Sequence, residues 1–379
     1  MKKFTLLTTS LISAAMLLAA CGGESSTQTT SAQPTTQAMN LAGNGERCHV
    51  VTSHYVGWYP AEYIQSSGIA ATMGNKYNVD LKIDFMEAYG STIERFTAGD
   101  YDGITITTLD ALIAPAASGV NTEIVVNGDF SNGNDAVLVI NSANSVSSPK
   151  DLVGRDINLV QGSVSEYLFD RWLSIAGDGL TVADFNITNT TDTDMPALIA
   201  NAKEGEVYVT WNPFVFEAMQ GRPDDLRDVF NSSQIPGEIL DTIAMNANAS
   251  DACKVAVSEA WYTAMAEMSG PNNTKMLTAM ANFATGGSNP DTSENVAWYN
   301  AQLATTNMFY APSDAIAVAK GSQLQKTMQS TYDFASDRGM LTSQIGVQFP
   351  DGSVVGDANN VTMTFTTKYM EAAAAALSN

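Results

Sequence analysis

From about residue 47 onward, segments with the hydrophobic pattern of β-strands alternate with segments that have the pattern of α-helices. Short apolar or alternating runs are typical of β-strands, and each is followed by a loop and a stretch of helical periodicity. The first runs predict strands at residues 49–52, 80–86, 103–107 and 123–127, and helices at residues 61–76, 91–98 and 108–117. Strands that alternate with helices of this length predict a parallel α/β sheet.

A second series of strands begins after the Ser-, Asn- and Gly-rich segment at residues 131–134. The predicted strands are residues 136–140, 156–160, 185–188, 207–210 and 238–244, with helices that open near Ser163 and Asp194. The last strand leads the chain out of this second unit. The remainder is predicted to be mostly helical, at residues 252–268, 273–284, 293–304, 312–318, 324–338 and 372–377.

The N-terminal segment has the pattern of a bacterial lipoprotein signal. Lys2 and Lys3 precede the apolar stretch Phe4–Ala20, which ends in small residues just before Cys21. Cleavage at this point removes residues 1–20 and leaves Cys21 as a lipidated N-terminus. An ordinary signal peptide or a membrane helix that contains a cysteine is the alternative.

Residues 21–45 follow as a lipidated linker that is rich in Ser, Thr, Gln and Gly and poor in bulky apolar side chains. Such a segment cannot bury enough surface to fold, so we expect it to be flexible. The folded part of the chain would then lie outside the cytoplasmic membrane, in the periplasm or at the cell surface. No second apolar stretch reaches the length of a membrane span, which leaves the lipid as the only predicted membrane contact.

The charge of the chain excludes one class of partner. The 379 residues include 18 Lys and Arg but 40 Asp and Glu, which gives a formal net charge of −22. A strongly acidic surface repels the phosphate backbone, so we expect no nucleic-acid partner.

Catalytic and metal-binding motifs are missing from the sequence. We find no nucleophile elbow, phosphate-binding Gly-rich loop, His-Glu-x-x-His or paired-cysteine spacing. The two histidines, His49 and His54, are too few for a multi-histidine metal site. We therefore expect a protein without metal, cofactor or enzymatic activity. Cys48 and Cys253 either form one disulfide in an oxidising compartment or remain as two buried thiols.

Polar and aromatic residues repeatedly follow the predicted strands, where the loops of an open α/β sheet form a binding cleft. These loops lie in segments without a single Lys or Arg, namely residues 49–75, 104–139, 156–170, 186–202, 205–221 and 229–253. An anionic ligand usually needs a basic residue, whereas carboxylates and aromatic faces suit a cation. The pattern indicates a cationic or a neutral, amide-like solute.

Several of these segments resemble the solute-binding proteins of taurine/nitrate/sulfonate-type ABC importers. The residues that carry this resemblance are Tyr55–Trp58, Thr97–Thr105, Asp151–Gly154 and Trp211–Pro213. The urea-carboxylase-associated branch is the most similar, through residues Gly128–Asp135, Ser232–Glu238 and Ala301–Thr306. The resemblance extends from about residue 48 to the C-terminus.

The resemblance implies a two-lobed periplasmic-binding-protein fold of type II, in which each lobe is a mostly parallel sheet flanked by helices. Lobe I would comprise residues 46–130 and 242–379, and lobe II residues 131–241. The partners would be a small solute and the permease and ATPase of an ABC importer, and the protein would act as a monomer. Solute closes the two lobes about a hinge and is then delivered to the permease.

The ligand implied by the branch is urea or guanidinium. Sulfonate-binding relatives hold the acid group at a helix start that corresponds to Ser163–Glu166, which here has no basic neighbour, and an acidic position of theirs is Asn212 in this chain. Taurine, another sulfonate or nitrate remains the alternative. A pyrimidine-synthase-like enzyme on the same fold is the rival from another class, although it would need clustered cysteines and a histidine, for which only His54 is available. An adhesion lipoprotein is the third interpretation.

The candidate ligand-binding residues lie on loops after strands or at the starts of helices. They are Tyr55, Trp58, Tyr59, Thr108, Asp110, Asp129, Asn132, Asn134, Asp135, Ser163, Ser165, Glu166, Asp192, Trp211 and Glu238. Each has a structural alternative: packing for the aromatic residues, and helix capping or turn hydrogen bonds for the polar ones.

Overall fold

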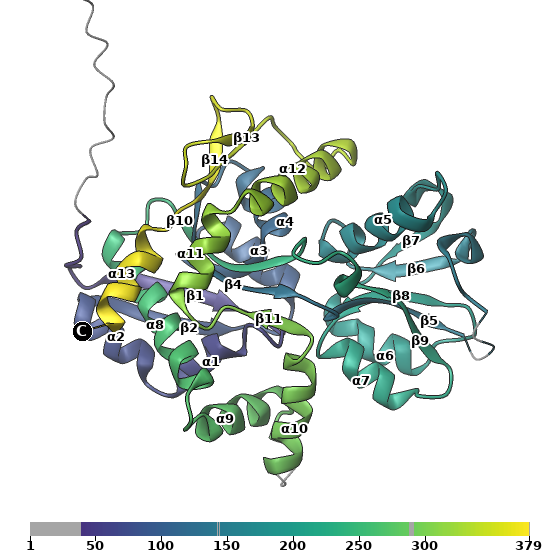
Figure 1. Cartoon of the computed structure of the whole chain (residues 1–379), viewed down its shortest axis with the longest axis horizontal. Coiled ribbons are helices and arrows are strands. Elements are labelled where there is room, and N and C mark those ends of the chain that lie inside the picture. Colours follow the sequence, from purple (N-terminus) through teal and green to yellow (C-terminus); the bar gives the residue numbers. More distant parts are fainter. Residues whose placement is uncertain (1–38, 142, 144, 288–291, 379) are drawn as a thin grey trace, which may run out of the picture. The chain divides into compact units, whose positions relative to one another are not determined.

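Two mixed β-sheets divide the strands of the chain by their position in the sequence (Figure 1). The computed structural model describes residues 39–141, 143, 145–287 and 292–378. The predicted signal peptide, Cys21 and the predicted linker up to residue 38 lie outside the described residues.

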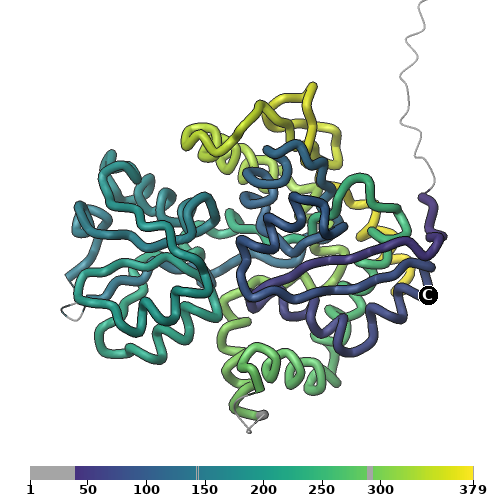
Figure 2. The backbone as a smooth tube through the Cα atoms, turned by 180° about the vertical axis from the view of Figure 1, so that it is seen from behind, coloured from purple at the N-terminus to yellow at the C-terminus, as the bar shows by residue number. Residues whose placement is uncertain are grey.

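The larger sheet contains nine strands within the described residues, in the order β13-β12-β14-β4-β10-β3-β1-β2, with β11 paired to β4. Its strands are β1 (Glu46–Thr52), β2 (Val79–Phe85), β3 (Gly103–Thr107), β4 (Thr122–Ser131), β10 (Leu240–Asn246), β11 (Thr306–Met308), β12 (Gly346–Gln348), β13 (Val354–Gly356) and β14 (Val361–Phe365). Figure 2 shows how the yellow C-terminal segments return to the sheet that contains the purple N-terminal strand.

The smaller sheet contains five strands within the same part of the chain, in the order β7-β6-β8-β5-β9. Its strands are β5 (Asp135–Ile140), β6 (Asp156–Leu159), β7 (Asn186–Asn189), β8 (Val207–Trp211) and β9 (Leu226–Asn231). The chain therefore leaves the larger sheet at the end of β4 and returns to it at β10.

Helices flank both sheets because each has one apolar face to bury. Those of the larger sheet are α1 (Tyr59–Ser66), α2 (Ile69–Tyr77), α3 (Tyr89–Thr97), α4 (Thr108–Ala111), α8 (Asp251–Ser269), α9 (Thr274–Ala284), α10 (Thr292–Leu303), α11 (Pro312–Lys320), α12 (Ser322–Asp337) and α13 (Lys368–Leu377). Those of the smaller sheet are α5 (Val164–Ala176), α6 (Met195–Ala200) and α7 (Phe214–Gly221). One π turn at Leu112–Ala116 extends α4, and short 3₁₀ turns lie at Pro149–Leu152, Val182–Asp184, Asp192–Asp194 and Ser232–Gln234.

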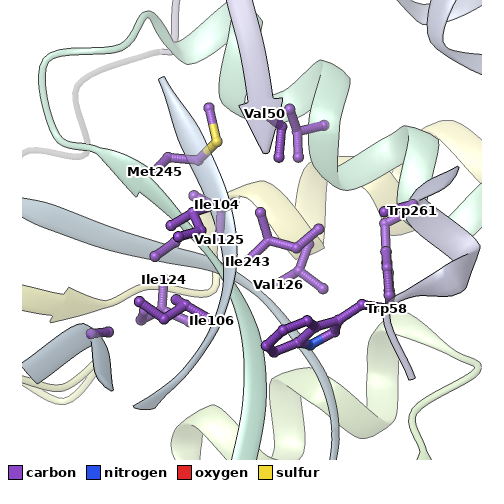
Figure 3. Packing of buried hydrophobic residues seen from close by; sticks show 14 of the residues in the cluster. Val50, Trp58, Ile104, Ile106, Ile124, Val125, Val126, Ile243, Met245 and Trp261 are labelled. Atoms are coloured by element: carbon purple, nitrogen blue, oxygen red, sulfur yellow. The ribbon is translucent and has the colours of Figure 1, made fainter. Parts of the chain in front are cut away.

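The main hydrophobic core lies on the central strands of the larger sheet. Figure 3 shows side chains of β1, β3, β4 and β10 gathered there, among them Val50, Ile104 and Val126, with Trp58 in the same cluster. Strand β10 is apolar enough to occupy the centre of the sheet, since Leu240 and Ala244 are completely buried. Its second residue, Asp241, is almost as buried but carries a carboxyl group, which makes it an exception in this core.

The structure corrects the prediction of parallel sheets. Strand β10 runs antiparallel to both β3 and β4, and β5 runs antiparallel to both β8 and β9. Strands β5 and β10 are the first strands after the chain crosses from one sheet to the other. Each begins at the edge of its sheet where its neighbours end, so it runs in the direction opposite to theirs.

Other differences concern single elements. The predicted helix at residues 61–76 is two helices, α1 and α2, separated at Gly68, whose φ of +87° is a left-handed conformation that glycine adopts without strain. The C-terminal strands β12 to β14 lie in a region predicted to be mostly helical, and strands of three to five residues carry too little pattern to detect.

Cys48 of β1 and Cys253 of α8 form a disulfide, with their Cα atoms 5.5 Å apart. Both side chains are completely buried. Of the two alternatives left by the sequence, the structure has the bonded form. In the part of the chain that the structure describes, no helix combines the length and hydropathy needed to cross a membrane.

Candidate functional site

A small cavity lies where strand ends of the two sheets meet. Its empty volume, part of which is open to solvent, is about 260 Å³. Ordinary ligand pockets have volumes of about 300–1,000 Å³, so a ligand that binds here must be small. The residues that line the cavity are Tyr55, Trp58, Tyr89, Thr107, Asp135, Val164, Trp211, Ile239 and Asp241.

Strand register brings the acidic residues of the cavity together. Asp241 on β10 is paired with Thr107 on β3 and with Asp129 on β4. In the smaller sheet, Asp135 on β5 is paired with Trp211 on β8. The cavity thus lies at the carboxyl ends of β3, β4 and β8, and at the beginnings of their antiparallel neighbours β5 and β10.

Aromatic side chains form one wall of the cavity. The Tyr55 and Trp58 rings are 5.0 Å apart, Trp58 lies 5.2 Å from Tyr89, and Tyr89 lies 5.9 Å from Trp211, all between ring centroids. The indole N–H of Trp58 is buried and has no hydrogen-bond partner within the protein. The rings are tilted or edge-on to one another, and the face of an aromatic ring can pack against a planar cation.

Four buried aspartates surround this wall. Asp135 and Asp241 line the cavity, and Asp110 and Asp129 lie behind its lining residues. The hydroxyl of Tyr55 donates a hydrogen bond of 2.7 Å to Oδ1 of Asp129, and that of Tyr89 donates one of 2.7 Å to Oδ2 of Asp110. One carboxyl oxygen in each of Asp110, Asp129 and Asp241 has no hydrogen-bond partner.

Burial raises the pKa of all four carboxyl groups. The pKa of Asp110 is raised to about 6, that of Asp135 to about 7 and that of Asp129 to about 8, with loss of hydration as the main cause. Burial, followed by repulsion from Asp129 and Asp135, raises the pKa of Asp241 well above its usual range. Among the described residues that line the cavity, none is Lys, Arg or His.

Gly57 allows the first loop to close over Asp129. A Cβ atom at this position would lie 2.5 Å from Oδ2 of Asp129 and would also overlap the ring of Tyr55. Any larger residue would push the Tyr55 hydroxyl away from the carboxyl group that it contacts.

The structure brings a subset of the predicted site residues to the cavity. Tyr55, Trp58, Asp135 and Trp211 line it, while Asp110 and Asp129 form hydrogen bonds to its aromatic wall or to the first loop. The remaining predicted residues do not line it, and they are Tyr59, Thr108, Asn132, Asn134, Ser163, Ser165, Glu166, Asp192 and Glu238.

Several of these residues form contacts within the protein. Glu238 pairs with both Nε and Nη2 of Arg171. Ser163 caps α5 by accepting the backbone N–H of Ser165, and Oε2 of Glu166 accepts the backbone N–H of Gly162.

Other predicted residues form hydrogen bonds near the cavity or near the crossings between the sheets. The Tyr59 hydroxyl contacts Nδ1 of His54 at 3.0 Å. The Asn134 side chain bonds to Thr306, and the backbone N–H of Asn132 donates to Thr305. Oδ2 of Asp192 accepts the backbone N–H of Tyr89 at 3.1 Å. Thr108 is buried in the first turn of α4, and the buried hydroxyl of Ser165 has no partner.

Five lining residues were missed by sequence reasoning: Tyr89, Thr107, Val164, Ile239 and Asp241. A signal for Asp241 exists, because it is the one carboxyl residue in the mainly apolar segment at residues 239–245. A charged side chain in a central strand has to find a partner or a ligand.

Metal binding requires several ligand side chains that converge on one point. Among the described residues, no group of three His, Cys, Asp or Glu side chains is placed to hold a metal ion. The four aspartates therefore surround the cavity without forming a coordination shell.

Comparison with known proteins assigns the fold. The family described as NMT1/THI5 like matches residues 75–240. No curated protein matches the chain.

Solved structures of similar architecture cover most of the chain. The alkanesulfonate-binding protein SsuA from Xanthomonas axonopodis pv. citri, bound to MOPS, superposes with a TM-score of 0.60 at 16% identity, over 81% of this chain and 96% of that one. The aliphatic sulphonate-binding protein SsuA from Escherichia coli gives 0.59 at 16% identity, over 78% and 89%. The Candida albicans CA3427 gene product, which exhibits the generic periplasmic binding protein structural fold, gives 0.53 at 15% identity, over 78% and 91%.

These similarities confirm the predicted fold class. The chain has the α/β periplasmic-binding-protein fold, with helices on both sheets. The cavity occupies the place where ligands bind in open α/β architectures, outside the carboxyl ends of strands.

Proposed function

We propose that this protein is an extracytoplasmic solute-binding protein of an ABC importer and that it captures a small nitrogenous cation of the guanidinium type. The observation that supports the ligand class is the cavity itself, in which Asp135 and Asp241 face aromatic rings and no basic side chain is present among the lining residues. A planar cation supplies N–H donors to carboxylates at its edge and a charged face to aromatic rings.

Anions fit this cavity poorly. Two of the similar structures are sulfonate-binding proteins, and the start of a helix is a common anion site because its N–H groups are free. Here Val164 begins α5 at the cavity, and the backbone of Val164 lowers the pKa of the neighbouring Asp110. A carboxyl group of the protein thus lies close to this helix start and would repel the acid group of a ligand.

Contacts between the two sheets support capture by closure. Trp211 at the end of β8 donates its indole N–H to the carbonyl oxygen of His54, which follows β1, and Tyr89 donates its backbone N–H to Asp192. We propose that the two lobes are residues 46–130 with 242–379 and residues 131–241, and these bonds would join them. A cation that contacts carboxylates from both sheets would favour this closed arrangement over an open one.

Binding without chemical conversion is supported by the state of the reactive side chains. Both ring nitrogens of His54 have partners, since Nδ1 contacts Tyr59 and Nε2 contacts Glu87 at 2.7 Å. Cys48 and Cys253 are joined in a disulfide. The described residues therefore contain no cluster of free cysteines of the kind that a synthase reaction would need. We further propose that the lipid on Cys21 anchors the protein, which delivers its ligand as a monomer to a permease and its ATPase.

The test is a calorimetric and thermal-shift titration of the mature protein with guanidinium chloride, urea, taurine and nitrate. We expect guanidinium to bind and to be recovered unchanged. Asp241→Asn is expected to weaken its binding roughly 10- to 100-fold, because a hydrogen bond to a charged group contributes about 1.5–3 kcal/mol.

Asp333→Asn, a change at an exposed position of α12, is the matched control and should bind as the parent protein does. Selective binding of taurine or nitrate would contradict the cation proposal, and conversion of the ligand would contradict the proposed binding role.

A further inference from the structure

The carboxyl groups of Asp129 and Asp241 form a buried pair that the receptor proposal alone does not explain. The two residues are register partners on neighbouring strands β4 and β10. Asp129 is completely buried and Asp241 is 2% exposed, and each has one carboxyl oxygen without a hydrogen-bond partner. Two such groups cannot readily both carry a charge, because burial removes their hydration and the second charge would be repelled by the first.

We infer that the empty site holds a proton between Asp129 and Asp241, and that an entering guanidinium-type cation displaces this proton to the solvent. The exchange conserves charge: one positive charge enters, one proton leaves, and no covalent bond of the ligand changes. This inference rests on the proposed function, since it describes how the same site accepts its cation.

The surroundings of the pair favour exchange over simple addition. The ionisable groups that face the two carboxyls from the neighbouring elements are Asp110, Asp135, Tyr55, Tyr89, Tyr299 and Tyr310. All are acids, and the tyrosines are held neutral by burial, which raises the pKa of each hydroxyl. None of them can supply the positive charge that a second ionised carboxylate requires.

The geometry also assigns different roles to the two members of the pair. Asp241 lines the cavity and can contact the ligand directly, whereas Asp129 lies behind it and is held by the Tyr55 hydroxyl. Hydrogen bonding from Tyr55 and from Asp241 lowers the pKa of Asp129, in opposition to the larger effect of burial. The proton can therefore reside on either carboxyl until the cation makes the ionised form of Asp241 favourable.

Exchange provides selection between solutes of nearly identical shape. Guanidinium keeps its charge at any physiological pH and can replace the proton. Urea has a similar planar outline but no charge, so it would leave the pair protonated and lose the charge-assisted hydrogen bonds. The pair would thus discriminate by charge where the walls of the cavity discriminate by size.

Calorimetry with guanidinium chloride in buffers of different ionisation enthalpy measures the protons released. At pH 7 we expect the mature protein to release about one proton per bound cation, and its affinity to rise about tenfold per pH unit between pH 6 and 7. The rise should level off once the pH passes the raised pKa values of the pair, of which that of Asp129 is about 8.

Asp241→Asn keeps the shape of the pair but removes the carboxyl group that lines the cavity, so it should release much less than one proton and show a flatter pH profile. Asp129→Asn removes only the repulsion that Asp129 adds to the effect of burial, so Asp241 should still release a proton and its pH profile should shift to lower pH. Asp333→Asn should keep the parental release. Circular dichroism and a thermal unfolding curve establish that each variant is folded.

The outcomes separate the two proposals. Binding of guanidinium with no proton release and a flat affinity from pH 6 to 8 would overturn the exchange and leave the receptor intact. Failure of guanidinium to bind at any pH would overturn both. If the Asn variants fail to fold, the buffer dependence and pH slope of the unmodified protein still decide the question.

Discussion

The indole nitrogen of Trp211 lies 3.0 Å from the carbonyl oxygen of His54 and donates a hydrogen bond to it. The two residues are far apart in the sequence and belong to different sheets, at the end of β8 and in the loop after β1. The same indole forms part of the cavity wall, so one side chain contributes both to the cavity and to a contact between the two parts of the fold.

Replacing Trp211 with Phe should weaken ligand binding without unfolding the protein. The change keeps an aromatic wall but removes the bond to His54, and a hydrogen bond of this kind contributes about 1 kcal/mol, or roughly fivefold in affinity. Titration with guanidinium would measure the change in affinity, and small-angle scattering with and without ligand would measure the change in closure. Trp172→Phe is the control, because Trp172 stacks on Phe230 and does not line the cavity. Equal effects of the two variants would contradict the bridging role.

The Tyr55 hydroxyl is expected to tune the acidity of Asp129. Its hydrogen bond lowers the pKa of Asp129, so Tyr55→Phe should raise that pKa above its value of about 8. Guanidinium affinity at pH 7 should then fall, and the pH at which affinity levels off should rise. A titration series from pH 6 to 9 measures both effects, and an unchanged profile would contradict the coupling.

The empty protein should lose stability as the pH rises from about 4 to about 8. A carboxyl group whose pKa is raised on folding binds more protons in the folded state, so its contribution is present below the unfolded pKa and lost as the pH passes the folded one. For Asp110, with a folded pKa of about 6 against an ordinary value of 3.8, the loss is about 3 kcal/mol.

Thermal unfolding without ligand measures this trend across the pH range. Asp110→Asn should flatten the curve relative to Asp333→Asn. A curve that rises steadily with pH would show that the buried carboxyl groups do not control it. Guanidinium chloride and urea are unsuitable as denaturants here, because both are candidate ligands.

Removing the disulfide should destabilise the protein strongly. Cys48 and Cys253 are separated by 205 residues, and closing a loop of that length contributes about 5 kcal/mol in the chain-entropy model. The double variant Cys48→Ala, Cys253→Ala should therefore melt at a much lower temperature. A reducing agent should lower the melting temperature of the parent protein but leave that of the variant unchanged.

The lipid anchor predicted at Cys21 can be tested by fractionation of a bacterium that expresses the full chain. The parent protein should remain with the membrane, incorporate labelled palmitate and extract into detergent. Cys21→Ala should lose the label and pass into the soluble extracytoplasmic fraction. Membrane retention of that variant would contradict a purely lipid-mediated attachment.

Much of the fold was predictable because its signals are local. The alternation of strands and helices up to residue 211 follows from periodicity, and Ser163 was recognisable as the start of a helix because its side chain caps the first turn. Strand direction was not predictable in the same way. The insertion of β10 between β3 and β4 depends on where the chain re-enters the sheet, which no window of sequence contains.

The candidate site shows the same division. The sequence by itself determined its chemical character, because the loops after the strands carry aspartates and aromatic residues and no Lys or Arg. Only the tertiary structure decided which of these side chains meet. Asp129 and Asp241 become neighbours through strand register, and Glu238 is instead paired with Arg171 on α5. The reason is physical: side-chain type sets what a residue can bind, but contacts between distant segments depend on strand order and on the burial that results from it.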